Sequence, residues 1–118
     1  MKPTRFYSKR QEEAIAREFK KRGIHSRRVA NSGATPFHKG DVEVADFLIE
    51  CKTTTCEHKA SFSIKEEWLK KNKEEAFAMG KRHNALAFQF GEGEPNYYVI
   101  DEKQFQEYLF LLREESVE

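Results

Sequence analysis

The apolar run Phe47–Ile49, followed directly by Glu50, Cys51 and Lys52, constrains the fold of this chain most strongly. Such a run predicts a buried strand, and side chains along a strand point alternately to the two faces of its sheet. Glu50 and Lys52 therefore share one face, and Phe47, Ile49 and Cys51 occupy the other. Asp41 precedes Glu50 by nine residues, so a hairpin would bring two carboxylates and an ammonium into one patch.

This patch has the chemistry that phosphodiester hydrolysis requires. Mg²⁺ prefers oxygen ligands and typically binds one or two protein carboxylates, here Asp41 and Glu50, together with water and substrate phosphate. Lys52 would orient the attacking water or stabilise the developing charge. Glu-x-Lys is also a common tripeptide, and a cross-strand charge pair on a solvated face remains the alternative.

The length of 118 residues predicts a single domain, 1–118, with one core. There is no apolar stretch near the roughly 18 residues that cross a bilayer and no secretory signal, which predicts no membrane association and a cytoplasmic location. Cys51 and Cys56 are five residues apart. This spacing fits two free thiols in a reducing compartment.

The charge is divided unevenly between the two ends of the chain. Although the net charge is only +1, residues 1–40 carry 11 Lys/Arg against 3 Asp/Glu, whereas the remainder carries 10 against 17. Such a basic segment is typical of a polyanion-binding face, and equally of a solvated helix. Its basic residues include Arg5, Lys9, Arg10, Arg17, Lys20, Lys21, Arg22, Arg27, Arg28 and Lys39.

Capping and periodicity signals predict the order helix, three strands, helix, two strands, helix. This order indicates an α/β fold with a mixed central sheet flanked by helices. The first helix is expected from an N-cap at Ser8 to Gly23, the second from a capping box of Ser63 and Glu66 to about Gly80, and the third from a cap at Asp101. Strands are expected at 24–31, 41–44, 47–54, 85–90 and 97–100.

Two faces of these helices stand out. Glu12 shares the apolar stripe of Ile15 and Phe19, so it should either meet a cation or point into a site, unless it only supports the helix dipole. The last helix is apolar over more than one face, which predicts core on one side and leaves a partner surface as the alternative. The packed face of the second helix is expected to comprise Trp68, Leu69, Ala76 and Phe77.

In order and spacing, these motifs resemble the PD-(D/E)XK nuclease superfamily, and within it the archaeal-type Holliday junction resolvases with their small phage-encoded relatives. The resemblance covers about residues 8–90. It departs from the superfamily pattern in having Gly40 at the proline position and a short connection between Asp41 and Glu50. It rests on Gln11-Glu12, Arg28 with Ser32-Gly33, Lys39-Gly40-Asp41, Phe47–Lys52 and Met79-Gly80-Lys81.

The resemblance implies a restriction-endonuclease-like core and a homodimer that resolves four-way DNA junctions by paired nicks during recombination or repair, in the nucleoid or in the cytoplasm of a phage-infected host. It also implies Mg²⁺, with Mn²⁺ as a substitute, bound by Asp41, Glu50 and the backbone carbonyl of Cys51, with Glu12 as a further candidate ligand. Lys52 would be catalytic, and Ser32 would lie beside the scissile phosphate. The expected catalytic residues are Glu12, Ser32, Asp41, Glu50 and Lys52, and the expected DNA contacts are Arg5, Lys9, Arg10, Arg27, Arg28 and Lys39.

Two alternatives remain open. The same catalytic residues would serve a duplex nickase or a restriction-like endonuclease, since the substrate depends on what the basic face accepts. A non-catalytic, zinc-stabilised nucleic-acid-binding protein would instead use Cys51, Cys56 and His58, although structural zinc usually needs a second pair of closely spaced ligands.

Overall fold

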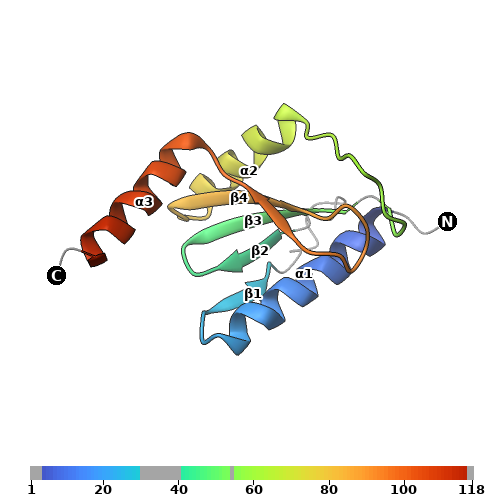
Figure 1. Ribbon diagram of the computed structural model, residues 1–118, viewed down its shortest axis with the longest axis horizontal. Coiled ribbons are helices and arrows are strands. Elements are labelled where there is room, and N and C mark those ends of the chain that lie inside the picture. Colours follow the sequence, from blue (N-terminus) through green and yellow to red (C-terminus); the bar gives the residue numbers. More distant parts are fainter. Residues whose placement is uncertain (1–3, 30–40, 54, 117–118) are drawn as a thin grey trace.

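The computed structural model describes residues 4–29, 41–53 and 55–116, and they form the predicted mixed α/β arrangement of three helices and a five-stranded sheet (Figure 1). The elements follow the predicted order of helix, three strands, helix, two strands and helix. They are α1 (Thr4–Lys21), β1 (Ser26–Arg28), β2 (Asp41–Val44), β3 (Phe47–Lys52), α2 (Glu66–Ala78), β4 (His83–Phe88), β5 (Tyr97–Val99) and α3 (Glu102–Ser116).

The strands lie in the spatial order β1-β2-β3-β4-β5. Only β3 and β4 are parallel, and α2 makes the crossover between them; the other pairs are antiparallel. A two-residue turn joins β2 to β3, with Ala45 at φ 50° and Val44 paired with Phe47. Because turn length fixes hairpin register, this turn decides which residues of β2 and β3 face each other.

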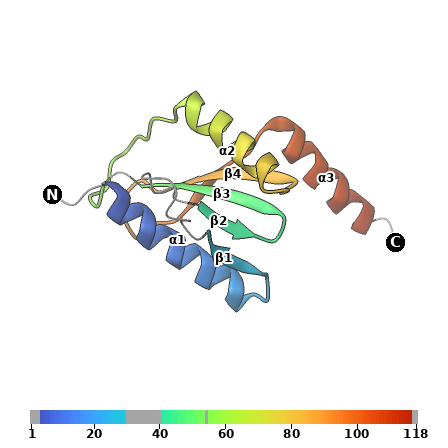
Figure 2. The same cartoon turned by 180° about the vertical axis from the view of Figure 1, so that it is seen from behind.

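Helices α1 and α2 pack against opposite faces of the sheet. On the α1 face, Ile15 and Ala16 join a core of Val42, Ile49 and other small apolar strand residues. On the α2 face, the buried side chain of Asn72 donates to the carbonyl of Leu48 over 3.2 Å. The two helices lie on either side of the strands when the molecule is seen from the front and from behind (Figures 1 and 2).

Glycines mark the C-termini of α1 and α2 as predicted, whereas the predicted capping boxes do not mark their N-termini. α1 ends as predicted, since Ile24 N donates to Phe19 O and Gly23 N to Lys20 O, with Gly23 at φ 78°. This is a Schellman motif, which needs the left-handed conformation that glycine adopts at little cost. The same pattern at Gly80, at φ 73°, ends α2.

The predicted N-termini of the first two helices are wrong. α1 already begins at Thr4, since no Gly or Pro interrupts the four residues before Ser8. Lys65, not Ser63, precedes α2 at the N-cap, and it makes no side-chain cap. Glu66 and Glu67 in the first turn interact favourably with the helix dipole instead.

Four strand predictions also need correction. Of the predicted strand 24–31, β1 covers 26–28, because it pairs with three residues of the four-residue β2; residues 30 and 31 lie outside the described residues. β3 ends at Lys52, and β4 covers 83–88 instead of 85–90, because their parallel register runs from Phe47↔His83 to Lys52↔Phe88. β5 stops at Val99, one residue earlier than expected.

The packed face of α2 differs from the prediction at one residue. Phe77 is 87% exposed, whereas Asn72 is fully buried and accepts from Asn84 Nδ2 over 2.9 Å. At 100° per residue, Phe77 lies off the stripe through Trp68, Asn72 and Ala76. The polar Asn72 therefore belongs to the packed face, for which only apolar residues were predicted.

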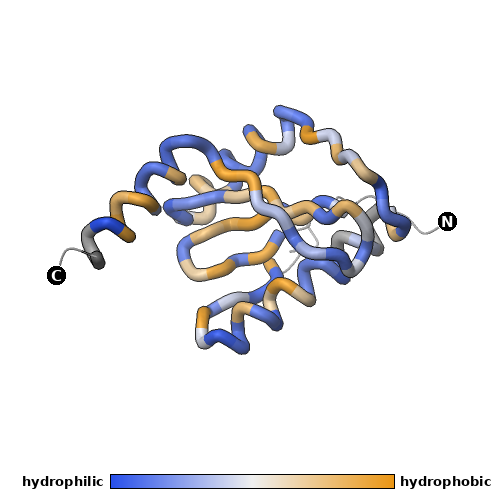
Figure 3. Tube along the Cα trace, in the orientation of Figure 1, coloured by the Kyte–Doolittle hydropathy of each residue, from blue (hydrophilic) through white to orange (hydrophobic). Residues whose placement is uncertain are grey.

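The last helix is capped as predicted but is not core. Asp101 Oδ1 accepts from Gln104 N over 2.9 Å, as an N-cap should. Six large apolar side chains between Phe105 and Leu112 are 44–58% exposed, which contradicts the expected core face. Figure 3 shows hydrophobic residues in the central strands and again along α3. Within the described ranges, no helix has the length and apolar character needed to cross a membrane.

These packing differences predict a large effect on stability for one alanine substitution in α2 and a small effect for another. Asn72→Ala should lower the free energy of unfolding by about 1–3 kcal/mol, because it leaves buried partners without hydrogen bonds. Phe77→Ala should change it by less than about 0.5 kcal/mol, as expected at an exposed position. Urea denaturation followed by circular dichroism measures both. The reverse order would show that α2 is rotated from its position here.

Candidate metal centre

Asp41 and Glu50 lie directly opposite each other on β2 and β3. Because the Ala45-Asp46 turn pairs Val44 with Phe47, counting outward along both strands pairs Asp41 with Glu50. Both side chains are on the α2 face and are buried, at 2% and 6% exposure. The short connection between them is therefore what aligns the two carboxylates.

A third carboxylate reaches this pair from α2. Ligand atoms of Asp41, Glu50 and Glu75 all lie within 4.8 Å of one another. Glu75 is one helical turn after Asn72, whose hydrogen bond to the carbonyl of Leu48 fixes α2 over β3. We call Asp41, Glu50 and Glu75 the acidic trio.

The neighbouring Glu43, on the same face, is an example of a buried acid that cations neutralise. It is buried like Asp41, but Arg27 Nε at 2.6 Å and Lys81 Nζ at 3.1 Å pair with its oxygens. Burial alone would raise the pKa of Glu43, yet the hydrogen bonds from Lys81 and Arg27 lower it. Asp41 has no such cation within ion-pair distance among the described residues.

Asp41, which has no cation to pair with among the described residues, is protonated instead. Burial, followed by the negative charge of Glu50 and a hydrogen bond with it, raises the pKa of Asp41 to about 9. The charges of Glu75 and Glu12 add to this shift. Asp41 therefore holds a proton at neutral pH unless another positive charge takes its place.

The oxygen atoms of the acidic trio suit a divalent cation in chemical terms. Asp41 Oδ1 and Glu50 Oε2 are buried without a hydrogen-bond partner among the described residues, which is costly for polar atoms. Oxygens on opposite sides of one bound cation lie about 4–5 Å apart at the usual Mg²⁺ and Ca²⁺ bond lengths. This is the largest separation that one ion allows between its ligands, and the trio offers three hard oxygen ligands within 4.8 Å of one another.

Lys52 stands beside the trio, as the strand alternation predicted. Its Nζ is 3.6 Å from Glu50 Oε1 and 4.7 Å from the centre of the Trp68 ring. Lys65 approaches the same ring at 5.7 Å. The ring therefore holds the Lys52 ammonium next to Glu50 by a cation–π contact.

Glu12 meets a cation, which was one of its two expected roles. Its fully buried carboxylate accepts from Arg28 Nε over 3.0 Å, and Arg28 Nη1 is 3.7 Å from Glu13. Glu12 does not join the acidic trio, although its charge reaches Asp41. Among the described residues, the third carboxylate comes from α2 and not from α1.

The cysteines and histidines do not form a zinc site in the described part of the chain. Cys51 is buried on the α1 face, where burial raises the pKa of its thiol, and Cys56 is exposed. His58 Nδ1 contacts Glu94 at 2.8 Å, and His83 packs on Phe47. Both thiols are free, as predicted.

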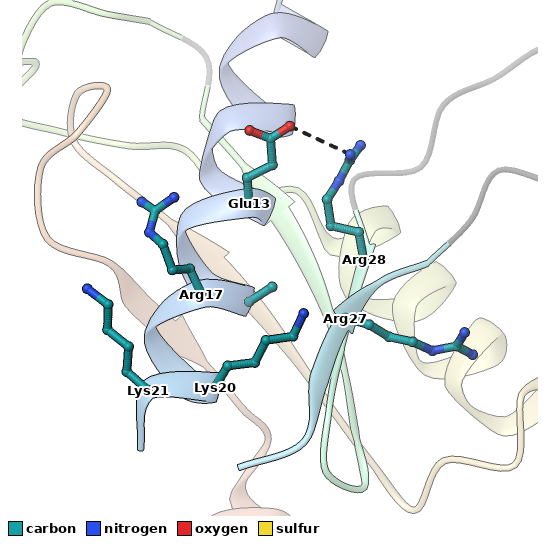
Figure 4. A pocket seen from close by; sticks show the side chains of 7 residues that line it. Glu13, Arg17, Lys20, Lys21, Arg27 and Arg28 are labelled. Carbon is teal, nitrogen blue, oxygen red and sulfur yellow. Dashed lines mark ion pairs between the residues drawn. The ribbon is translucent and has the colours of Figure 1, made fainter. Parts of the chain in front are cut away.

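Basic side chains gather in a groove between α1 and β1, which we call the α1–β1 groove (Figure 4). It encloses about 620 Å³. The basic residues that line it are Arg17, Lys20 and Lys21 of α1 and Arg27 and Arg28 of β1, together with the acidic Glu13. In Figure 4, Glu13 and Lys20 point toward β1, whereas Arg17 and Lys21 lie on the other side of α1 and Arg27 points away from the helix. Lysine and arginine side chains along a groove can bind the phosphates of a polyanion.

The other predicted DNA contacts have different positions. Lys9 is exposed on α1, and Arg10 is paired with Glu92 at 2.9 Å in a second hollow of about 390 Å³. Arg5 belongs to α1, but its side chain is outside the described part. Ser32 and Lys39 also lie outside the described residues, so their predicted roles stay predictions.

Sequence reasoning missed Glu75, although a signal for it was present. The rule that singled out Glu12 as an acid on a packed stripe applies equally to α2. Glu75 follows Trp68 and Asn72 on the stripe that faces the sheet. Reading Phe77 as part of that stripe hid the polar side of the helix.

No family model, no curated protein and no solved structure matches this chain. The functional conclusion therefore rests on the geometry of the acidic trio, on Lys52 and on the α1–β1 groove.

The raised pKa of Asp41 predicts that the metal-free protein loses stability as pH rises. Between the ordinary pKa of 3.8 and about 9, the folded state holds a proton on Asp41 that the unfolded chain does not. The free energy of unfolding should therefore fall with pH, by at most about 1.4 kcal/mol per pH unit from this group.

Urea denaturation in EDTA at pH 5–9 measures this slope. Asp41→Asn should flatten it, because the amide cannot ionise, whereas the control Asp46→Asn in the exposed hairpin turn should preserve it. Equal slopes for the wild type and Asp41→Asn would contradict the buried, cation-free environment of Asp41.

Proposed function

We propose that this chain is a divalent-metal-dependent DNA endonuclease of the PD-(D/E)XK type that resolves four-way junctions by paired nicks. The observation that carries the proposal is the convergence of three carboxylates, two of them buried, within 4.8 Å, next to the Lys52 ammonium. Neither the cluster of carboxylates nor the neighbouring lysine is specific for this activity by itself. Together they combine ligands for a hard cation with a charge suited to a phosphoryl transition state.

The arrangement of elements supports a restriction-endonuclease-like core. A hairpin presents Asp41 on β2 and the Glu50-x-Lys52 pattern on β3, and α2 then leads to the parallel β4. This order agrees with the one that the motif resemblance implies. The resemblance also favours a junction as substrate over a linear duplex.

In this proposal, Asp41, Glu50 and Glu75 hold one Mg²⁺ or Mn²⁺, with the backbone carbonyl of Cys51 as a further ligand. A bound divalent ion polarises the phosphate and lowers the pKa of water. The ligands must be ionised to bind it. Asp41 would therefore have to be ionised to hold such an ion.

Lys52 acts on the nucleophile or on the charge that develops at phosphorus. Hydrolysis forms a bond between phosphorus and the water oxygen, breaks the bond to the leaving sugar oxygen, and delivers a water proton to that oxygen. An ammonium held by Glu50 and Trp68 needs little reorganisation during this step. Trp68 would therefore position Lys52 without contacting the substrate.

The α1–β1 groove would hold the DNA backbone. Phosphate contacts provide affinity and orientation, and they carry no base sequence. Recognition through such contacts suits a substrate selected by shape. Two symmetric nicks require two equivalent sites, which a two-fold homodimer supplies.

Cleavage of an end-labelled immobile four-way junction tests the activity directly, beside a duplex of matched sequence. With Mg²⁺, the wild type should cut the junction in symmetric pairs, and EDTA should stop the reaction. Lys52→Ala should lower the rate by about 10²–10³-fold, the usual effect of removing one group that stabilises the transition state. The matched control is Lys65→Ala, which contacts the same Trp68 ring at 5.7 Å and should stay within a few-fold of wild type.

The outcomes separate the alternatives. Equal cutting of duplex and junction would preserve the nuclease site and identify a nickase or restriction-like substrate. Undiminished cutting by Lys52→Ala would overturn the site. Binding without any cutting in Mg²⁺ or Mn²⁺ would favour the non-catalytic nucleic-acid-binding alternative.

The groove assignment predicts a salt-dependent effect of Lys20. Lys20→Ala should weaken junction binding and reduce the slope of log K against log salt by about 0.9, the value for one lost phosphate contact. Lys73→Ala, an exposed lysine on α2, should leave both unchanged. Fluorescence anisotropy at several salt concentrations without metal measures this. An unchanged slope for Lys20→Ala would place the DNA elsewhere.

A further inference from the structure

α3 carries an apolar surface that the other described residues leave uncovered. The helix projects from the sheet at one end of the long axis of the molecule, which measures 53 Å (Figures 1 and 2). Two contacts tie its first half to β4: Gln104 Oε1 accepts from Asn84 N over 2.8 Å, and Glu107 lies 3.9 Å from His83. Beyond them, tyrosine, phenylalanine and leucine side chains are about half exposed.

Four of these side chains form one stripe. Phe105, Tyr108, Leu109 and Leu112 follow the i, i+3, i+4, i+7 pattern of a helix that packs against another helix. Their exposures are 51%, 57%, 48% and 44%. A different side of α3 carries Phe110, which shares a surface hollow of about 460 Å³ with Arg82 of the same chain. The stripe is therefore turned away from that hollow.

We propose that this stripe is a self-association surface, covered by the α3 stripe of a second copy in antiparallel orientation. The spacing of the four residues, three, one and three, is the same in both directions. An antiparallel two-fold pair therefore places Phe105 against Leu112 of the other copy and Tyr108 against Leu109. Each layer combines a large ring with a smaller branched side chain, and such a self-complementary patch is what an isologous interface requires.

The exposed apolar area of the stripe suits a weak, reversible dimer. A large side chain offers about 150–200 Å², and about half of it remains exposed on each of the four stripe residues, so two copies present on the order of 700 Å², the size of a small, transient interface. An uncovered helix of 15 residues is only marginally stable in water. Antiparallel pairing also brings the opposite ends of two helix dipoles together, which is favourable.

This surface is independent of the acidic trio, which lies on the α2 face of the sheet. Self-association through α3 stands whether or not the chain cuts DNA. If both proposals hold, the dimer provides the two equivalent sites that paired nicking requires.

Light scattering coupled to size exclusion tests the interface. At about 50 μM, the wild type should have twice the chain mass of 13.9 kDa. Tyr108→Glu and Leu109→Lys should each raise the dimer dissociation constant at least about 100-fold, because a charge is buried against an apolar layer. The matched control, Phe77→Glu, replaces an 87% exposed aromatic on α2 and should remain dimeric.

Mixing the two variants tests the antiparallel register. A Tyr108→Glu chain and a Leu109→Lys chain should form a heterodimer, since position 108 of one copy meets position 109 of the other and the new charges are opposite. Circular dichroism confirms that each variant is folded. A monomeric wild type, a dimer insensitive to both variants, or a mixture that stays monomeric would each overturn the proposal.

Discussion

The direct opposition of Asp41 and Glu50 across the β2–β3 hairpin is the constraint on which the site depends. A two-residue turn fixes the register, and the alternation of strand side chains then sends both carboxylates to the same buried face. Two acids so placed repel each other, and the folded chain accommodates them by keeping a proton on Asp41. The hairpin thus stores an electrostatic cost that a bound cation would remove.

Two other buried acids, Glu43 and Glu12, do not carry this electrostatic cost, because each is paired with a cation. Glu43 is two residues from Asp41 and equally buried, yet Arg27 and Lys81 neutralise it. Glu12 on the other face is neutralised by Arg28. These pairs stabilise the sheet edges and the α1 packing, since buried charges are tolerated when they are paired and hydrogen-bonded. The contrast separates structural acids from those available for metal binding.

The sequence predicted the element order, the shared face of Glu50 and Lys52, and the glycine-terminated helices, because these follow from alternation and local backbone conformation. It did not predict Glu75 in the trio or the burial of Asn72. Both depend on the rotation of α2 about its axis, which packing against β3 and β4 sets. The exposed stripe of α3 was expected to be core because periodicity identifies an apolar face without identifying what covers it.

The identity of the third carboxylate is the central claim, and metal titration tests it most directly. Mn²⁺ binding should be measured by isothermal titration calorimetry on the wild type, Glu75→Gln and Glu12→Gln, with circular dichroism to confirm folding. The account predicts that Glu75→Gln weakens binding at least about tenfold, because it removes one charged ligand, whereas Glu12→Gln stays within a few-fold of wild type. Loss of binding in Glu12→Gln with no effect in Glu75→Gln would contradict it.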